Sequence, residues 1–252
     1  MQGAIQYAKN TISDLLQNRM DISMLVISKS LGKSADDADY ANKQAHVELA
    51  ARMRRRDPGT APNVGDRVAY VIIQKAKNTP AYDKSEDPVF VLENNLPIDT
   101  EYYLTNQLSN PLTRIFEPII PNPQTLLSGD HTRTVTKVTP KTGGIMMFAV
   151  KKEKCMGCKT LISPEDLKSG RTGAPLCSNC AGRESEIYIS KLNDVNSHQS
   201  VFNKLWTECQ RCQSSFHQDV ICSNRDCPIF YKRKKVHIDL VAAQEALERF
   251  AW

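Results

Sequence analysis

The residues with the clearest chemistry in this 252-residue chain are eight cysteines, all of which lie between positions 155 and 227. The first four form two Cys-x2-Cys pairs separated by eighteen residues: Cys155, Cys158, Cys177 and Cys180. Each pair places two thiolates on one side of a tight turn, so two pairs can surround one ion at Zn–S distances of about 2.3 Å. Redox-active or merely buried cysteines are the alternative, but this spacing is specific to metal binding. Since four thiolates leave no open coordination position, the spacing predicts a structural zinc site.

The second four cysteines comprise one Cys-x2-Cys pair and two single residues: Cys209, Cys212, Cys222 and Cys227. Four cysteines so close together in a reduced chain predict another metal centre. The spacing leaves the metal open. Four thiolates suit a 4Fe–4S cluster, and Cys227-Pro228 is similar to the end of some ferredoxin motifs. Four thiolates also suit zinc, and His217 could replace one of them in a mixed zinc site.

The cysteines are expected to be reduced because the sequence shows no sign of export. Residues 1–20 lack a basic start followed by an apolar stretch, so we expect no secretory signal. The longest apolar run, "IMMFAV" at 145–150, is far shorter than the roughly 20 residues that a membrane span requires. We therefore predict an intracellular chain without a membrane partner.

Basic residues are concentrated in two places, although the net charge is only +5. One is "ARMRRRDPG" at 51–59, and the other is "YKRKK" at 231–235. Each can be a solvated helix surface or a phosphate-contacting one, and the second can also be a nuclear-import signal. No aromatic residues alternate with the arginines of 51–59 as they would on a base-stacking platform. A nucleic-acid contact there is therefore expected to involve the backbone and not to read sequence.

The sequence indicates no catalytic centre. Asp36, Asp37 and Asp39 are the one tempting group of carboxylates, and they precede a predicted helix, where acidic residues cap free amides. No Gly-rich phosphate loop, His-Glu metal helix or Gly-x-Ser-x-Gly elbow is present.

Hydrophobic periodicity predicts the elements that must position these residues. Helices are predicted over 2–20, 38–56, 184–206 and 236–250, and strands over 24–28 and 67–75. Asp99 is expected to cap a further helix through 100–108. The predicted organisation is a cysteine-free region at 1–140, a linker at 141–152, a zinc module at 153–183, a connecting helix at 184–206, a second metal module at 207–231 and a final helix at 232–252.

Several stretches resemble a known family. "HVELAARMRRRDPGTAPNVGDRVAYVII" at 46–73 and "AKNTPAYDKSEDP" at 76–88 are similar to the thumb of B-family replicative DNA polymerases. "CMGCKTLI" at 155–162, "CSNCAGRESEIY" at 177–188 and the stretch at 205–236 resemble the C-terminal metal-binding domain of delta-type catalytic subunits of that family. The resemblance implies an α+β fold, with a mainly helical thumb followed by a small Cys-rich module with two clusters and connecting helices.

The resemblance also implies roles for particular residues. The first four cysteines would bind zinc and be linked to the sliding clamp, and the second four would hold a 4Fe–4S cluster and dock the accessory B-subunit. The thumb would grip duplex primer–template DNA through six cations: Lys29, Arg52, Arg54, Arg55, Arg56 and Arg67. A nuclear location follows from the same resemblance.

The resemblance covers only part of a polymerase. No exonuclease domain, fingers or palm is recognised, so the palm aspartates and their Mg²⁺ would lie outside these residues. The chain is then expected to be inactive alone as a DNA-directed DNA polymerase. The alternatives are a free-standing iron–sulfur redox protein and a zinc-ribbon DNA-binding protein without polymerase ancestry. The thumb-like stretches argue against both.

Overall fold

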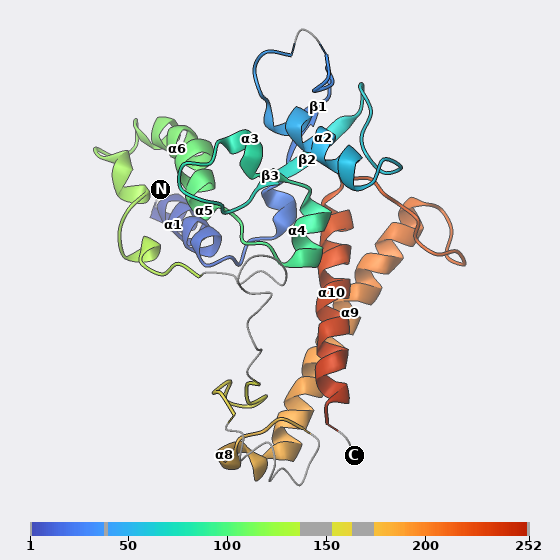
Figure 1. The fold of residues 1–252 in the computed structure, drawn as a ribbon. Helices are drawn as coiled ribbons and strands as arrows, with labels where there is room; N and C mark the ends of the chain where they lie inside the picture. The colour runs from blue at the N-terminus through green and yellow to red at the C-terminus, as the bar shows by residue number, and fades with distance from the viewer. Residues whose placement is uncertain (1, 38–39, 137–152, 163–173, 251–252) are drawn as a thin grey trace. The chain divides into compact units, whose positions relative to one another are not determined.

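The computed structural model describes residues 2–37, 40–136, 153–162 and 174–250 (Figure 1). The chain forms two compact units. Unit 1 comprises Met1–Lys141 together with Arg225–Tyr231, and unit 2 comprises Thr142–Asn224 together with Lys232–Trp252. The described elements confirm the predicted α+β class, since long helices accompany one small sheet.

The sheet of unit 1 has three antiparallel strands in the order β1-β2-β3. The strands are β1 (Ile27–Ser30), β2 (Arg67–Ile72) and β3 (Ser85–Glu86). The central strand β2 confirms the prediction for 67–75, and it is buried on both faces from its second residue onward. Tyr70 pairs with Ile27 on one side, and Val71 pairs with Glu86 on the other.

The strand predicted at 24–28 is misplaced, because a helical turn precedes it. Ile22–Met24 form a 3-10 turn, and the Asp21 carboxylate accepts the N–H of Ser23 at 3.1 Å. An aspartate that caps a turn in this way overrides the local strand preference. β1 therefore begins only at Ile27.

Short helices surround the sheet of unit 1. They are α1 (Gln2–Leu16), α2 (Ala45–Arg56), α3 (Ala81–Lys84), α4 (Pro88–Asn94), α5 (Thr100–Tyr102), a π-helical stretch η2 (Tyr103–Leu108), α6 (Ser109–Phe116), and the 3-10 turns η3 (Pro123–Leu126) and η4 (Asp130–Thr132). The predicted cap is confirmed, since Asp99 accepts the N–H of Tyr102 at 3.0 Å. α1 ends before the predicted position, and Asn18 just beyond it has a left-handed φ of 59°.

The interpretation of the acidic group as helix caps is wrong. α2 begins at Ala45, not at 38, and its N-cap residue Gln44 makes no side-chain capping bond. The Asp37 carboxylate instead accepts the N–H of Ser34 at 2.7 Å within a turn. Asp39 lies outside the described residues.

The core of unit 1 is formed around β2 and α2, with Val71 and Leu49 fully buried. Tyr103 lies in this core. Its hydroxyl accepts the N–H of Ile72 at 3.0 Å and donates to the carbonyl of Leu25 at 2.8 Å. Burial raises the pKa of Tyr103. The segment at 225–231 contributes to the same core through Phe230 and Tyr231.

Unit 2 consists mainly of two long helices. α9 (Glu184–Cys212) has 29 residues and spans about 44 Å at 1.5 Å per residue. It extends past the predicted end at 206. α10 (Pro228–Glu248) begins earlier than predicted, because proline suits the first helical position and starts the helix directly after Cys227.

The two helices run antiparallel within unit 2. The rings of Phe202 and His237 lie 5.4 Å apart, and those of Tyr188 and Phe250 lie 5.6 Å apart. The C-terminal end of the chain is thus returned to the start of α9. Among the described helices, none combines the length and apolar character needed to cross a membrane.

Candidate metal centre and nucleic-acid interface

The first four cysteines come together in unit 2. The Sγ atoms of Cys155, Cys158, Cys177 and Cys180 all lie within 4.8 Å of one another, and those of Cys158 and Cys177 are 3.6 Å apart. Four sulfurs at 2.3 Å from a tetrahedral zinc ion would be separated by about 3.8 Å. The four side chains therefore fit one zinc ion without rearrangement of the backbone.

The first Cys-x2-Cys pair lies in a tight hairpin. The N–H of Cys155 donates to the carbonyl of Thr160 at 2.8 Å, and the N–H of Ile162 donates to the carbonyl of Glu153 at 3.0 Å. Lys159 reverses the chain in a left-handed conformation with a φ of 62°. This conformation is uncommon for a residue other than glycine, and it places Cys158 and Cys155 on the same side of the turn.

Gly157 occupies a crowded position in the hairpin. A Cβ atom there would lie 2.8 Å from Cδ1 of Ile187 and 3.0 Å from Sγ of Cys180. A side chain at position 157 would therefore force Ile187 and Cys180 to shift, and glycine avoids this crowding. Gly157 lies between the two cysteines of the first pair, so the packing of that turn against α9 depends on this residue.

The second pair begins the short helix α8 (Ser178–Ala181), where Cys177 is the N-cap residue and Cys180 lies one turn later. The N–H of Cys177 donates to Sγ of Cys155 at 3.4 Å. Burial alone raises the pKa of Cys155, but N–H groups that include that of Cys177 lower it below its ordinary value. The Thr160 hydroxyl, 2.9 Å from Sγ of Cys158, helps to lower the pKa of Cys158 to about 6. Both shifts favour the thiolate that a metal ion requires, whereas a hydrogen bond with Cys177 is the main cause that raises the pKa of Cys180 to about 12.

The site has a small apolar core of its own. Cys155, Cys177 and Cys180 are buried with residues that precede and follow them: Ile162, Ala174, Leu176 and Phe250. Arg249 forms an ion pair with Glu153 at 2.8 Å beside this core. The packing of Phe250 against these cysteines was not apparent from their spacing. Four clustered thiols, three of them buried, suit a closed structural site, in which protein side chains fill every coordination position.

The second four cysteines lie on different elements. Cys209 and Cys212 lie in the last turn of α9, Cys222 lies in the loop that follows, and Cys227 directly precedes α10. His217 is exposed in the same loop. Over the described residues, only the first four cysteines have Sγ atoms that all lie within 4.8 Å of one another. The metal of the second set remains a prediction.

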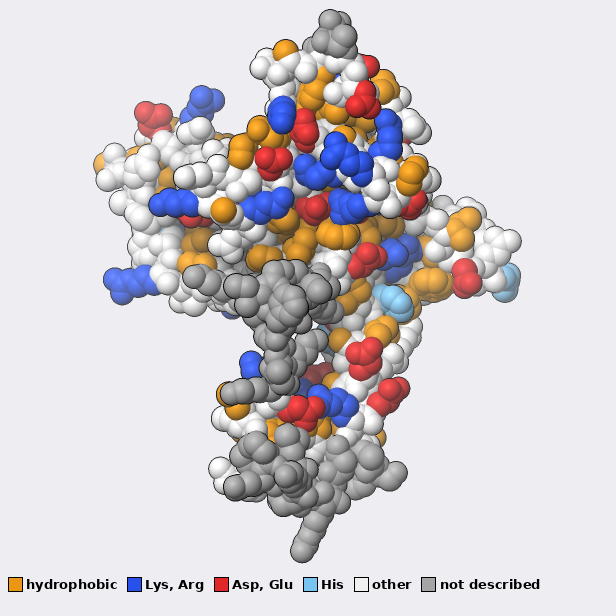
Figure 2. All heavy atoms as spheres, viewed as in Figure 1, with side chains coloured by type: hydrophobic (Ala, Val, Ile, Leu, Met, Phe, Trp, Pro, Cys, Tyr) orange, Lys and Arg blue, Asp and Glu red, His pale blue; other side chains and the backbone are white. Residues whose placement is uncertain are grey.

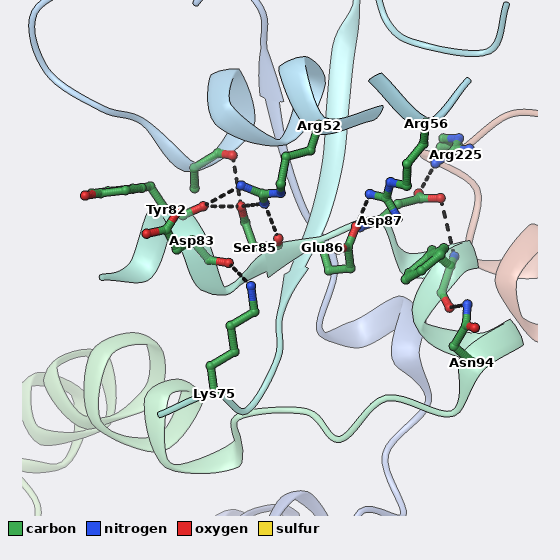
Figure 3. A network of polar contacts seen from close by, with 12 residues as sticks. Arg52, Arg56, Lys75, Tyr82, Asp83, Ser85, Glu86, Asp87, Asn94 and Arg225 are labelled. Atoms are coloured by element: carbon green, nitrogen blue, oxygen red, sulfur yellow. Dashed lines mark hydrogen bonds and ion pairs between the residues drawn. The ribbon is translucent and has the colours of Figure 1, made fainter. Parts of the chain in front are cut away.

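Two of the six predicted DNA-contacting cations, Arg52 and Arg56, bond residues of β3 within unit 1. Arg52 of α2 donates to the carbonyl of Ser85 at 2.5 Å and to its hydroxyl at 3.0 Å. Arg56, one turn later, pairs with Glu86 at 2.5 Å, and its guanidinium lies 4.2 Å from the ring centroid of Phe90. Figure 3 shows both side chains directed at β3.

A third arginine extends this network, and its role was not predicted from the sequence. Arg225, between two cysteines of the second set, forms an ion pair with Asp87 (Figure 3). Ser85, Glu86 and Asp87 are thus three consecutive residues that are each held by one arginine. Because 138 positions separate Arg225 from Asp87, no local pattern could have revealed this pair.

The other four predicted cations have different surroundings. Arg67 donates to the hydroxyl and the carbonyl of Ser28, both at 3.1 Å, and lies 3.6 Å from the carboxylate of Asp226. Lys29 is exposed on β1, and its charge adds to burial in lowering the pKa of His46 near the start of α2. Arg54 and Arg55 are exposed at the other end of α2, and they border a cavity of about 140 Å³. In Figure 2, basic side chains gather over this part of unit 1 with acidic ones among them.

Comparisons with known proteins match both halves of the chain. The family model of DNA polymerase family B matches residues 1–119, and that of the C4-type zinc-finger of DNA polymerase delta matches residues 155–233. The second range includes all eight cysteines.

Relatives from distant organisms extend the match to nearly the whole chain. DNA polymerase delta catalytic subunits of Oryza sativa subsp. japonica and Drosophila melanogaster are 55% and 56% identical over 98% of it, and that of Schizosaccharomyces pombe is 55% identical over 99%. The chain spans only 22% of the length of each of these relatives. Over nearly its whole length the chain is therefore homologous to part of the DNA polymerase delta catalytic subunits, and its residues 1–119 match DNA polymerase family B.

Proposed function

We propose that this chain is the duplex-gripping and subunit-docking part of a replicative DNA-directed DNA polymerase of the delta type, acting in the nucleus. The observation that carries the proposal is the identity of about 55% across both halves. A free-standing iron–sulfur redox protein would have no need of residues 1–119, and a zinc-ribbon protein without polymerase ancestry would not match family B there. Nucleotide transfer, with its Mg²⁺, is assigned to other parts of a complete subunit.

In this proposal unit 1 acts as a thumb that holds primer–template duplex. Its exposed cations would neutralise phosphates, so that binding follows the backbone and not the base sequence. No aromatic side chain lines the cavity beside Arg54 and Arg55, which supports a phosphate contact over base stacking.

Unit 2 is proposed to dock other replication proteins. Zinc would cross-link the two Cys-x2-Cys pairs and so supply the stability that their small apolar core lacks. Cys155, Cys158, Cys177 and Cys180 hold that ion, and Ile187 and Phe250 keep it at the start of α9. A rigid site in this position suits engagement of the sliding clamp. Cys209, Cys212, Cys222 and Cys227 are proposed to hold a 4Fe–4S cluster and to dock the accessory B-subunit.

Metal analysis combined with subunit capture tests this proposal. Anaerobically purified protein should contain about one zinc and four irons per chain and be brown. Cys222→Ser should abolish capture of the purified B-subunit and leave duplex binding intact, whereas Ser223→Ala, at the adjacent exposed position, should change neither. Two zincs without iron would exclude the iron–sulfur cluster but not the docking role. Equal loss of capture and duplex binding in Cys222→Ser would contradict two separate functions.

A further inference from the structure

The six cations that the sequence predicts to contact DNA have unequal access to a ligand. Resting on the proposed thumb function, we infer that Arg54 and Arg55 bind one phosphate of the duplex backbone at the cavity beside the end of α2, whereas Arg52 and Arg56 hold β3 in place and do not contact DNA.

The bonds of Arg52 and Arg56 argue against a role in DNA binding. A guanidinium presents its N–H groups in one plane, and those of Arg52 are directed at the carbonyl and the hydroxyl of fully buried Ser85. The charge of Arg56 is matched by Glu86, which is 8% exposed, and one face of its guanidinium is covered by Phe90. A phosphate that drew either arginine away would leave buried polar groups of β3 without partners.

Arg54 and Arg55 differ from Arg56, which is also exposed, in that no ion pair is described for either of them. Both are exposed, and the only contact described for either is the weak bond of Arg54 to the carbonyl of Pro62 at 3.4 Å. The carbonyl end of α2 stabilises cations in this position, and two adjacent ones still leave donors for a ligand.

The cavity between them has the chemistry of a phosphate site. Its lining includes the apolar side chains of Leu31 and Val47 and the polar side chains of Ser34, Asp36 and the two arginines. Two positive charges against one negative charge leave the lining cationic. Asp36 is therefore expected to weaken the binding of a phosphate. Removing its charge should tighten binding, whereas removing either arginine should weaken it.

Salt dependence of duplex binding separates contacting from structural arginines. The complete zinc-loaded chain is titrated into a labelled DNA duplex between 50 and 300 mM salt. Arg54→Ala and Arg55→Ala should each reduce the slope of log K against log [salt] by up to about 0.9, and weaken binding roughly eightfold at 0.1 M salt. Asp36→Asn should tighten binding. Arg56→Ala should lower the Tm and leave the slope unchanged where the protein is folded.

Arg52→Lys provides a variant that keeps its charge but loses the forked bonds to Ser85. It should also lower the Tm with an unchanged slope. If folded Arg56→Ala loses slope while Arg54→Ala and Arg55→Ala do not, the assignment of the phosphate site is wrong and the thumb function stands. If the unaltered chain binds duplex without salt dependence, the proposed thumb function itself fails, and this inference with it.

Discussion

Replacing Tyr103 with phenylalanine should destabilise unit 1 far more than the loss of one oxygen atom suggests. The Tyr103 hydroxyl, in a side chain that is 4% exposed, bonds both the N–H of Ile72 and the carbonyl of Leu25. Phenylalanine would leave two buried backbone groups unpaired, each of which costs about 1–3 kcal/mol. We expect a total loss of about 2–4 kcal/mol, because small shifts of the backbone recover part of it.

The same unit contains a matched control. Tyr231 is 1% exposed, and over the described residues its hydroxyl has no hydrogen-bond partner. Tyr231→Phe removes the same atom from the same core but leaves no backbone group unpaired. Its effect on the free energy of unfolding should be close to zero or slightly stabilising.

Thermal unfolding of the zinc-loaded chain, followed by circular dichroism, is the assay. Because two units need not unfold together, hydrogen exchange at β2 should identify the transition that belongs to unit 1. The Tm of that transition should fall by roughly 4–16 °C in Tyr103→Phe and change little in Tyr231→Phe. A Tyr103→Phe variant as stable as the unaltered chain, or two variants equally damaged, would refute the assigned hydrogen bonds.

Three further predictions concern the zinc site, the arginine network and pH. Gly157→Ala should weaken the affinity of the site for zinc by about 1–3 kcal/mol, because the added methyl group overpacks against Ile187 and Cys180. Gly182→Ala, with open space around it, should leave that affinity unchanged. Competition with a chromophoric chelator measures both variants, and equal affinities would contradict the packing. Arg225→Ala should lower the stability of unit 1 by about 1–3 kcal/mol, a value reduced for the partial exposure of the arginine, because Asp87 loses its ion-pair partner. Arg211→Ala, which breaks an exposed ion pair, should cost under about 1 kcal/mol. Urea titrations measure both losses, and the opposite order would count against the network. Burial raises the pKa of Tyr103 and of Tyr231, so only the unfolded chain should ionise these residues as the pH passes about 10, and stability should fall there. This loss should be smaller in Tyr103→Phe, and an equal loss in both proteins would show that Tyr103 is not the cause.

The first metal site was predictable because its information is local. Two Cys-x2-Cys pairs define two turns, and each turn needs only its own residues to orient its thiolates. Gly157 was not singled out, since its importance depends on Ile187, thirty residues away. Metal identity at the second set could not be derived from spacing, because zinc and a 4Fe–4S cluster accept the same four thiolates.

The arginines of α2 show the corresponding limit for charged residues. Their positions in the sequence predict a cationic helix end, and the structure shows that end at Arg56. Which of them can reach a ligand depends on β3, whose residues follow some thirty positions later. Arginines of one basic run therefore have different surroundings, which composition cannot distinguish.

Phe230 and Tyr231 have a consequence for how the polypeptide can be divided. The chain leaves unit 1 near Lys141, passes through more than eighty residues, and returns to complete the same hydrophobic core. A gene product that stops at that first exit would lack two large aromatic side chains from its interior. Premature termination between positions 141 and 230 is therefore expected to destabilise the amino-terminal half, even though every residue of that half has been translated.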